Sequence, residues 1–263
     1  MTQQKRSTVP CVGDYFKMEK KLPKVLLACP TYEGKGYILE RFVKRIKELT
    51  YSNYDILFVD NSKGDKYFNK IKKLGIPVEK GKWDEQSKIR LTNAQNQLRE
   101  KFLEGNYDYF FSLEQDIIPP KDIIEQLIAY DKDIVGGWYY ITKVPRPCLC
   151  REWRLVDMKF CPKPFSLEEL GKEKLMKCFS ASWGCCLVKR KVLEKIRFKV
   201  YRTFAQHSDT WFYFDCEKNN FEVYVDIDLL VPHFQDYKWK EILSNDVEIE
   251  KDLIKMKLED GIK

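Results

Sequence analysis

The first part of the chain alternates between short apolar runs and longer segments with helical periodicity. Residues 24–29 are apolar almost throughout and end at Pro30, which predicts a buried strand. Residues 37–49 repeat apolar side chains at helical spacing, which predicts an amphipathic helix. The same alternation predicts further strands at 55–59, 76–78, 107–113 and 133–139, and helices at 66–73, 87–104 and 121–130. Apolar strands separated by helices indicate an α/β fold with a mainly parallel central sheet flanked by helices.

The pattern breaks between residues 141 and 180. This stretch holds four of the eleven prolines and four of the nine cysteines. We interpret it as a long functional loop or lid. Regular patterning then predicts a strand at 182–188, a helix at 189–196, a polar turn at 206–209, a helix at 210–219, a strand at 221–227 and an amphipathic C-terminal helix.

Composition indicates a folded protein without a strong demand for a polyanionic partner. The 263 residues are 44% apolar and 14% aromatic, which is enough to bury a large core. The net charge of +7 comes partly from the first 24 residues, so no nucleic-acid partner is expected. Apolar runs fall short of the roughly 18 residues that span a membrane, and residues 1–6 are polar. We therefore expect a cytoplasmic protein, with peripheral membrane contact through the basic N-terminus left open.

The nine cysteines are expected to be reduced thiols. Their number is odd, and their share of the chain is below that of a disulfide scaffold. The spacing of Cys148 and Cys150, with a single residue between them, does not match the knuckles of zinc ribbons. Cys185 and Cys186 fall in a predicted buried strand, where packing is the simplest role.

Polar residues follow three predicted strands of the first half. They are residues 30–34 (PTYEG), 60–62 (DNS) and 114–116 (EQD). Ligands in open α/β sheets bind at the carboxyl ends of strands, and two carboxylates two residues apart suit a hard divalent cation. When either of the last two segments is taken alone, an ordinary turn at 60–62 and a surface cap at 114–116 are the favoured explanations. Because Asp60 comes just past a strand end, we expect it to be solvated and to contribute little packing.

Taken in order, these segments resemble the GT-A glycosyltransferases, especially family 2-like members with an Asp-x-Asp signature, over about residues 24–235. The resemblance implies a GT-A, Rossmann-like fold with a smaller acceptor-side region, and a nucleotide-sugar donor held by the first half. It assigns nucleotide contacts to Pro30, Thr31, Tyr32, Glu33, Asp60, Arg90, Asn93, Glu114 and Gln115, with Asn96 as a further candidate. Because Glu114 replaces the first Asp of the signature, metal contact is expected to shift onto Asp116.

The second half carries the stronger part of this resemblance. Residues 182–196 resemble the strand and basic helix beneath the acceptor site, so Trp183 and Gly184, with Trp138, are assigned to acceptor or sugar contacts. Residues 208–212 resemble the acidic turn where inverting members place their general base, which implies that Asp209 is catalytic. His233 stands where many members supply a metal-binding histidine. Helix capping by Asp209 and a structural role for His233 are the simpler alternatives.

The sequence pattern and the resemblance together divide the chain into four parts. They are a basic N-terminal segment (1–23), a nucleotide-sugar-binding α/β half (24–140), a lid with the acceptor and catalytic half of the same domain (141–237), and a C-terminal amphipathic helix (238–263). It implies a Mn²⁺- or Mg²⁺-dependent, inverting transferase, with hexosyl transfer from a UDP-sugar favoured and a GDP-sugar as the alternative. The acceptor would be a glycan, lipid-linked or protein hydroxyl.

Two other function classes stay open at this point. A nucleotidyltransferase would share the α/β half, but the chain lacks a Gly-rich phosphate loop. A nucleic-acid- or membrane-surface-binding module would use the positive charge, and its association would be sensitive to salt.

Overall fold

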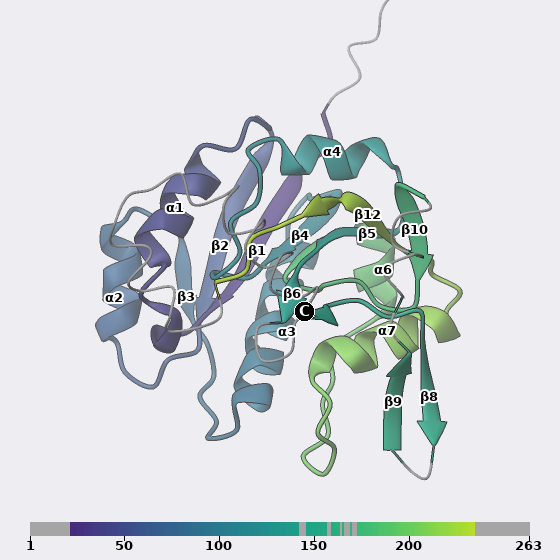
Figure 1. The fold of residues 1–263 in the computed structure, drawn as a ribbon. Helices are drawn as coiled ribbons and strands as arrows, with labels where there is room; N and C mark the ends of the chain where they lie inside the picture. Colours follow the sequence, from purple (N-terminus) through teal and green to yellow (C-terminus); the bar gives the residue numbers. More distant parts are fainter. Residues whose placement is uncertain are drawn as a thin grey trace, which may run out of the picture.

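The structure is a computed structural model that describes residues 22–141, 146–156, 159–163, 165, 169 and 173–234. Most of the predicted basic N-terminal segment, part of the predicted lid and the predicted C-terminal helix lie outside these residues. The described residues build one central sheet with helices on both of its faces (Figure 1).

Eight strands form the sheet, and most of its neighbouring strands run parallel. In spatial order they are β10 (Leu175–Cys178), β12 (Val223–Leu230), β5 (Ile134–Trp138), β11 (Cys185–Lys189), β4 (Tyr109–Leu113), β1 (Val25–Thr31), β2 (Tyr54–Asp60) and β3 (Val78–Lys80). β10 is antiparallel to β12, and β11 is antiparallel to both β4 and β5. The predicted α/β class with a mainly parallel sheet is confirmed.

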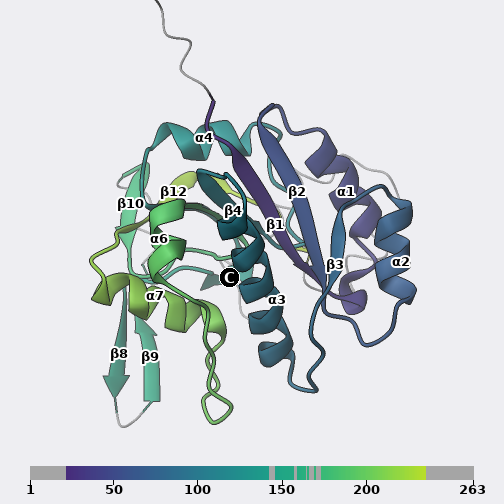
Figure 2. The same ribbon diagram turned by 180° about the vertical axis from the view of Figure 1, so that it is seen from behind.

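The helices cover the two faces of the sheet (Figures 1 and 2). They are the short 3-10 helix η1 (Glu33–Lys35), α1 (Leu39–Lys47), α2 (Lys66–Lys73), α3 (Ser87–Glu104), α4 (Ile123–Ala129), α6 (Arg190–Lys195) and α7 (Ser208–Lys218). Figure 2 shows α3, α6 and α7 together on one face. All the helices that periodicity predicted within the described residues are present.

Strand β1 shows how the sequence builds a core on each face. Val25, Leu27 and Cys29 belong to the hydrophobic cluster under α1, α2 and α4, whereas Leu26 and Ala28 belong to the cluster under α3, α6 and α7. All five are buried because successive side chains of a strand point to opposite faces. A strand covered on both sides must therefore be apolar at every position.

The predicted lid contains more regular structure than its sequence indicated. Short strands pair as β6 (Tyr140–Ile141) with β7 (Arg146–Pro147) and as β8 (Glu152–Val156) with β9 (Lys159–Lys163). The interpretation of 141–180 as a loop is wrong for β10, which forms an edge of the central sheet. This strand is only four residues long, too short for its alternation of buried and exposed side chains to stand out in the sequence.

Within the described residues, no helix combines the length and apolar character that crossing a membrane requires.

Candidate active site at the carboxyl ends of the central strands

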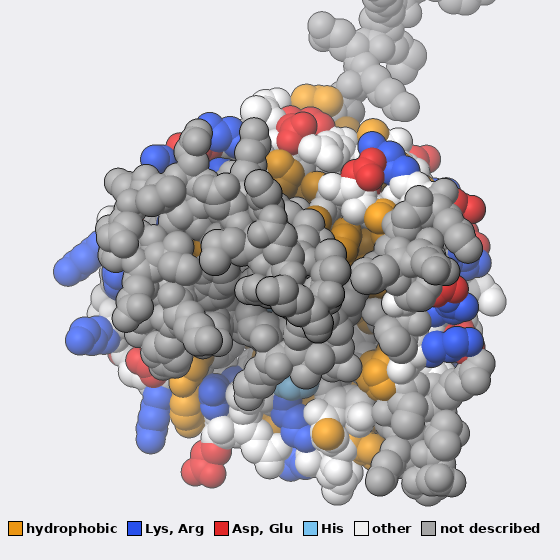
Figure 3. Space-filling model, in the orientation of Figure 1, with side chains coloured by type: hydrophobic (Ala, Val, Ile, Leu, Met, Phe, Trp, Pro, Cys, Tyr) orange, Lys and Arg blue, Asp and Glu red, His pale blue; other side chains and the backbone are white. Residues whose placement is uncertain are grey.

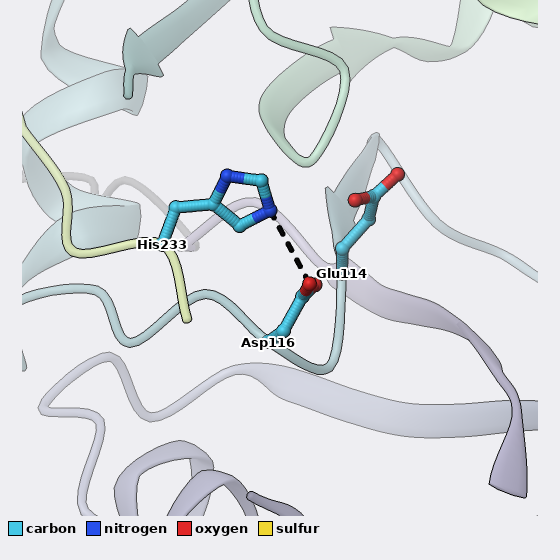
Figure 4. Close-up of side chains that lie close together, drawn as sticks. All are labelled: Glu114, Asp116 and His233. Carbon is cyan, nitrogen blue, oxygen red and sulfur yellow. Dashed lines mark ion pairs between the residues drawn. The ribbon is translucent and has the colours of Figure 1, made fainter. Parts of the chain in front are cut away.

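Two acidic residues and a histidine meet beyond the carboxyl end of β4. Glu114 and Asp116 follow β4 directly, and His233 follows β12. One potential ligand atom from each residue lies within 4.8 Å of the other two. Figure 4 shows the His233 ring directed toward the Asp116 carboxylate, where Nε2 is 3.2 Å from Oδ2. The structure thus brings together two residues predicted as metal ligands and the glutamate of the same signature.

Backbone pairing holds His233 at this place. The residue forms an isolated antiparallel bridge with Ile117. The Phe234 N–H donates to the Asp116 carbonyl at 2.8 Å, and the Ile118 N–H donates to the Pro232 carbonyl at 3.2 Å. Main-chain hydrogen bonds therefore fix the backbone of His233, and its ring centre lies 4.5 Å from that of Tyr139.

The carboxylate of Asp116 is ionised and fully buried. Its side chain has no exposed surface, and the Lys35 ammonium lies 2.8 Å from Oδ2 and 3.8 Å from the nearer oxygen of Glu114. Burial raises the pKa of Asp116, but the Lys35 ammonium and His233 outweigh it and hold this pKa at about 2. Burial also raises the pKa of Glu114, and there the Lys35 charge does not reverse the shift. The two carboxyls of one signature therefore differ in proton affinity.

These residues fit a divalent cation. The set offers two carboxylates and an imidazole, which are the oxygen and nitrogen donors that Mn²⁺ and Mg²⁺ accept. Oδ1 of Asp116 is buried and accepts no hydrogen bond from any described residue. A buried carboxylate oxygen without a donor is costly unless a cation or a ligand satisfies it.

Gln115, between the two acids, fastens the turn that follows β1. Its Oε1 accepts from the Tyr32 N–H, and its Nε2 donates to the Lys35 carbonyl and the Tyr67 hydroxyl, each at 2.8 Å. The side chain is 1% exposed. Gln115 was assigned to the nucleotide, and that role stays a prediction, but its amide already serves to position η1.

A cavity of about 170 Å³ adjoins the acidic pair. Its lining includes the predicted residues Pro30, Tyr32, Arg90 and Glu114, together with Lys35, Asn61, Ser87, Leu91 and His207. Lys35 was not among the predicted site residues, because a lysine that follows a turn has no sequence pattern that indicates a site. Asn61 was included only as part of the polar segment 60–62 and was not assigned a contact of its own.

Arg90 enters this cavity from α3 in a fixed geometry. Its Nη1 donates to the carbonyls of Asp84 and Glu85 at 2.8 and 2.9 Å. The guanidinium lies 4.3 Å from the ring centre of Trp83 and 5.1 Å from that of Tyr32. Its Nε is buried and has no hydrogen-bond partner among the described residues. A cation held between two rings with a donor to spare is suited to an anionic ligand.

Four other residues that were predicted to contact the nucleotide do not line this cavity. Thr31 is buried, and its hydroxyl donates to the Val59 carbonyl. Glu33 is exposed, and Asn93 does not line the cavity. The Asn96 amide pairs with the backbone of Phe198, which ties α3 to the segment after α6.

The expectation that Asp60 is solvated is wrong. Its side chain has no exposed surface, and Oδ2 lies 2.9 Å from the ammonium of Lys80. Oδ1 accepts from both the N–H and the hydroxyl of Ser62, at 3.0 and 2.6 Å. Asp60 and Lys80 face each other in the register of β2 and β3, so the neighbouring strand supplies the countercharge. The nucleotide role of Asp60 stays a prediction, but the residue is part of the folded core.

Asp209 lies in the first turn of α7, one residue inside the helix. The N-cap position belongs to His207, so the alternative of an ordinary N-cap is wrong for Asp209. Its Oδ1 accepts from the N–H of Thr210 at 2.8 Å. Burial raises the pKa of Asp209, while His207 opposes the shift. The Asp209 charge also contributes to the raised pKa of Glu114, so the two carboxyls are within electrostatic reach.

The two predicted sugar-binding tryptophans are packed in the core. Trp183 is 3% exposed and contacts Phe198 and Phe212, with ring centres 5.0 and 4.6 Å apart. Trp138 is 6% exposed, and its indole N–H donates to the Ile227 carbonyl. Their sugar contacts stay predictions, and packing gives both rings a structural role.

Gly184 is required by close approach. A Cβ at this position would lie 2.5 Å from Ile117 Cδ1, 2.8 Å from the Tyr139 hydroxyl and 3.2 Å from the Glu114 carboxyl carbon. Its N–H donates to the Tyr139 hydroxyl at 3.3 Å. Glycine therefore leaves the space that the Glu114 carboxyl occupies.

Seven cysteines are free thiols: Cys29, Cys148, Cys150, Cys178, Cys185, Cys186 and Cys216. Burial raises the pKa of Cys148 to about 12 and that of Cys150 to about 11. Within the described ranges, the group of three metal-ligating side chains that lie together contains no cysteine.

Comparisons with known proteins establish the fold. A mannosyltransferase from Pyrobaculum calidifontis, solved with GDP-Man and Mn²⁺, matches with a TM-score of 0.57 and 13% identity over 82% of this chain and 58% of that one. GalNAc-T7, solved with UDP, GalNAc and Mn²⁺, gives 0.59 and 12% over 82% and 44%. Residues 1–349 of Staphylococcus aureus TarS, solved with UDP-GlcNAc, give 0.51 and 14% over 79% and 57%. The chain spans about half the length of these proteins, and it has the GT-A glycosyltransferase fold.

No protein-family model matches the sequence, and the search of curated proteins finds no match.

The buried Asp60 generates a prediction about stability. Asp60→Ala removes the buried acceptor that Lys80 and Ser62 share, so we expect a loss of about 2 kcal/mol and a melting temperature lower by roughly 4 to 8 °C. Asp65→Ala is the matched control, because Asp65 lies 3.7 Å from the same lysine but is 77% exposed. Thermal unfolding of both variants provides the measurement. If the two variants have equal melting temperatures, the buried Asp60 does not stabilise the fold more than the exposed Asp65 does.

Proposed function

We propose that this chain is a divalent-metal-dependent glycosyltransferase that moves a sugar from a nucleotide-sugar donor to an acceptor hydroxyl. The observation that carries the proposal is the cluster of Glu114, Asp116 and His233 beside the cavity that Arg90 lines. This arrangement offers donor atoms for one cation next to a cationic side chain for phosphate. The GT-A fold supports a transferase, and solved structures of this fold contain GDP-Man or UDP together with Mn²⁺.

The donor nucleotide is proposed to bind in the cavity at the ends of β1, β2 and β4. The Arg90 guanidinium faces a diphosphate with a free donor, and the Asn61 side chain offers both a donor and an acceptor to the nucleoside. Asp60, which precedes Asn61, holds the strand end through its contacts with Ser62 and Lys80. A UDP-sugar is favoured and a GDP-sugar is the alternative.

Departure of the nucleoside diphosphate requires stabilisation of negative charge. Mn²⁺ or Mg²⁺ bound by Asp116 and His233, with Glu114 adjacent, would neutralise charge on the leaving phosphates. Because its pKa is about 2, Asp116 offers an ionised carboxylate over the whole neutral range. The protein's own contribution is a buried and prearranged ligand set.

Asp209 is proposed as the general base that takes the acceptor proton. Burial raises its proton affinity, which makes it a better base than a solvated aspartate. Attack by an acceptor that it activates implies inversion at the sugar carbon. Asp215, a weaker alternative on the same helix, lies 2.6 Å from the Lys199 ammonium. A glycan, lipid-linked or protein hydroxyl and a hexosyl donor stay the proposed substrate classes, and membrane contact through the basic N-terminus stays a prediction.

The function is tested by incubating the purified full chain with a panel of UDP- and GDP-sugars. We expect slow release of nucleoside diphosphate from one donor with Mn²⁺, and loss of release with a chelator. A binding module without turnover predicts no release from any donor. Release of pyrophosphate from a nucleoside triphosphate would instead indicate nucleotidyl transfer.

Shared ligation of one ion predicts strong coupling between Asp116 and His233. Asp116→Asn and His233→Ala should each lower Mn²⁺ affinity by at least the roughly 10- to 100-fold typical of losing a supporting residue, and the double variant should add little. Mn²⁺ titration with calorimetry in the presence of UDP measures all four proteins. His207→Ala controls for loss of a histidine, because His207 lines the adjoining cavity but is not part of the metal cluster. Additive effects would show that the two residues do not share a cation.

The base assignment predicts that chemistry and binding separate. Asp209→Asn should lower single-turnover transfer or donor hydrolysis by about 10²- to 10⁴-fold, while UDP affinity barely moves. Because the base acts when deprotonated and its pKa is raised, wild-type activity should fall with decreasing pH at values above the ordinary 3.8 of aspartate. Asp215→Asn is the comparison variant. Near wild-type turnover of Asp209→Asn would transfer the role to Asp215 or Glu33.

A further inference from the structure

The metal cluster already contains a cation that belongs to the protein. The ammonium of Lys35 lies 2.8 Å from Oδ2 of Asp116, the same oxygen that is 3.2 Å from His233 Nε2. It also lies 3.8 Å from Glu114. A divalent ion bound to Asp116 and His233 would therefore be placed against a positive charge that is already present.

The backbone of Lys35 is held in place by Gln115, the middle residue of the Glu114–Asp116 signature. Gln115 lies between the two acids, and its amide binds both ends of the turn, at Tyr32 and Lys35. The backbone of Lys35 is therefore fixed, whereas its four-carbon side chain has rotatable bonds. The position of the ammonium can change without moving the turn.

The same side chain lines the cavity on the nucleotide side. Lys35, Arg90 and Glu114 all line that cavity. A diphosphate in this cavity would offer Lys35 a second anionic partner. The lysine thus has two alternative sites, the Asp116 carboxylate and the phosphates of a bound donor.

We propose that Lys35 is an exchangeable counterion: it neutralises Asp116 in the free protein and moves to the donor diphosphate when a divalent cation binds. This inference rests on the proposed function. Its consequence is thermodynamic. Without nucleotide, the cation must displace Lys35 from Asp116, so it binds weakly. With nucleotide, the displaced ammonium has a new partner, so cation and nucleotide strengthen each other's binding.

The test is Mn²⁺ titration of the full chain by electron paramagnetic resonance, with and without UDP. Lys35→Met removes the charge but keeps the aliphatic stem, so Mn²⁺ affinity without UDP should rise by roughly tenfold. The same variant should bind UDP more weakly in saturating Mn²⁺, and UDP should enhance its Mn²⁺ binding less than in the wild type. Opposite changes in the two affinities distinguish charge exchange from a damaged fold, which would weaken both.

Lys63→Met is the matched control, because Lys63 is exposed in the loop after β2 and does not line the cavity. It should leave both affinities unchanged. Lys35→Gln is the second variant, since its amide still donates to the buried Asp116 should the Met variant fail to fold. Lys35→Arg keeps the charge and should keep the weak Mn²⁺ binding of the wild type.

Three results would overturn the inference, and they differ in what they leave standing. Equal Mn²⁺ affinity of Lys35→Met and wild type without UDP removes the exchange and leaves the metal-dependent transferase intact. If UDP binding requires Lys35 but not Mn²⁺, the ammonium permanently takes the place of the metal and no exchange occurs. If neither the wild type nor any variant binds Mn²⁺ or UDP, both the proposed function and the inference are wrong.

Discussion

The backbone pairing between residues 116–118 and 232–234 is the interaction on which the site depends. In the sheet, β12 is separated from β4 by β5 and β11, so three strand spacings, about 14 Å, lie between their ends. The chain crosses this distance over the strand ends. The Val231 N–H donates to the Trp138 carbonyl at the end of β5, and the next residues then pair with 116–118. Without this crossing, His233 and Asp116 would belong to separate parts of the sheet.

Charge neutralisation is the second constraint, because the site places ionised groups where water cannot solvate them. A buried carboxylate is unstable without a partner. The fold pairs two buried carboxylates with a lysine: Lys35 lies beside Asp116, and Lys80 lies beside Asp60. Figure 3 shows other lysines and arginines scattered around the margin of the molecule, where solvent screens them. The position of a lysine, rather than the excess of positive charge, decides what it does for the site.

Periodicity was enough to predict most of the fold. The strand at β1 and the helix at α3 are marked by clear patterns; α3 has its predicted bounds, and β1 continues two residues past its predicted end, through Pro30 to Thr31. Local pattern cannot reveal partners that come from elsewhere in the chain. Asp60 looks like a solvated strand end until β3 supplies Lys80 opposite it. The sequence around Trp183 does not reveal that α7 places Phe212 against its ring. The grouping of Asp116 with His233 was predictable only through resemblance, and Lys35 had no signal at all.

The carboxyls of the site differ in their surroundings, and this difference separates their chemical roles. Asp116 has an ammonium at 2.8 Å, so its proton affinity falls although it is fully buried. Asp209 and Glu114 are desolvated without a comparable countercharge, so their proton affinity rises. A metal ligand must be ionised, whereas a general base must be able to keep the proton it takes. Identical carboxyl groups therefore become suited to opposite tasks, and the decisive difference is the positive charge of Lys35 and His233 beside Asp116.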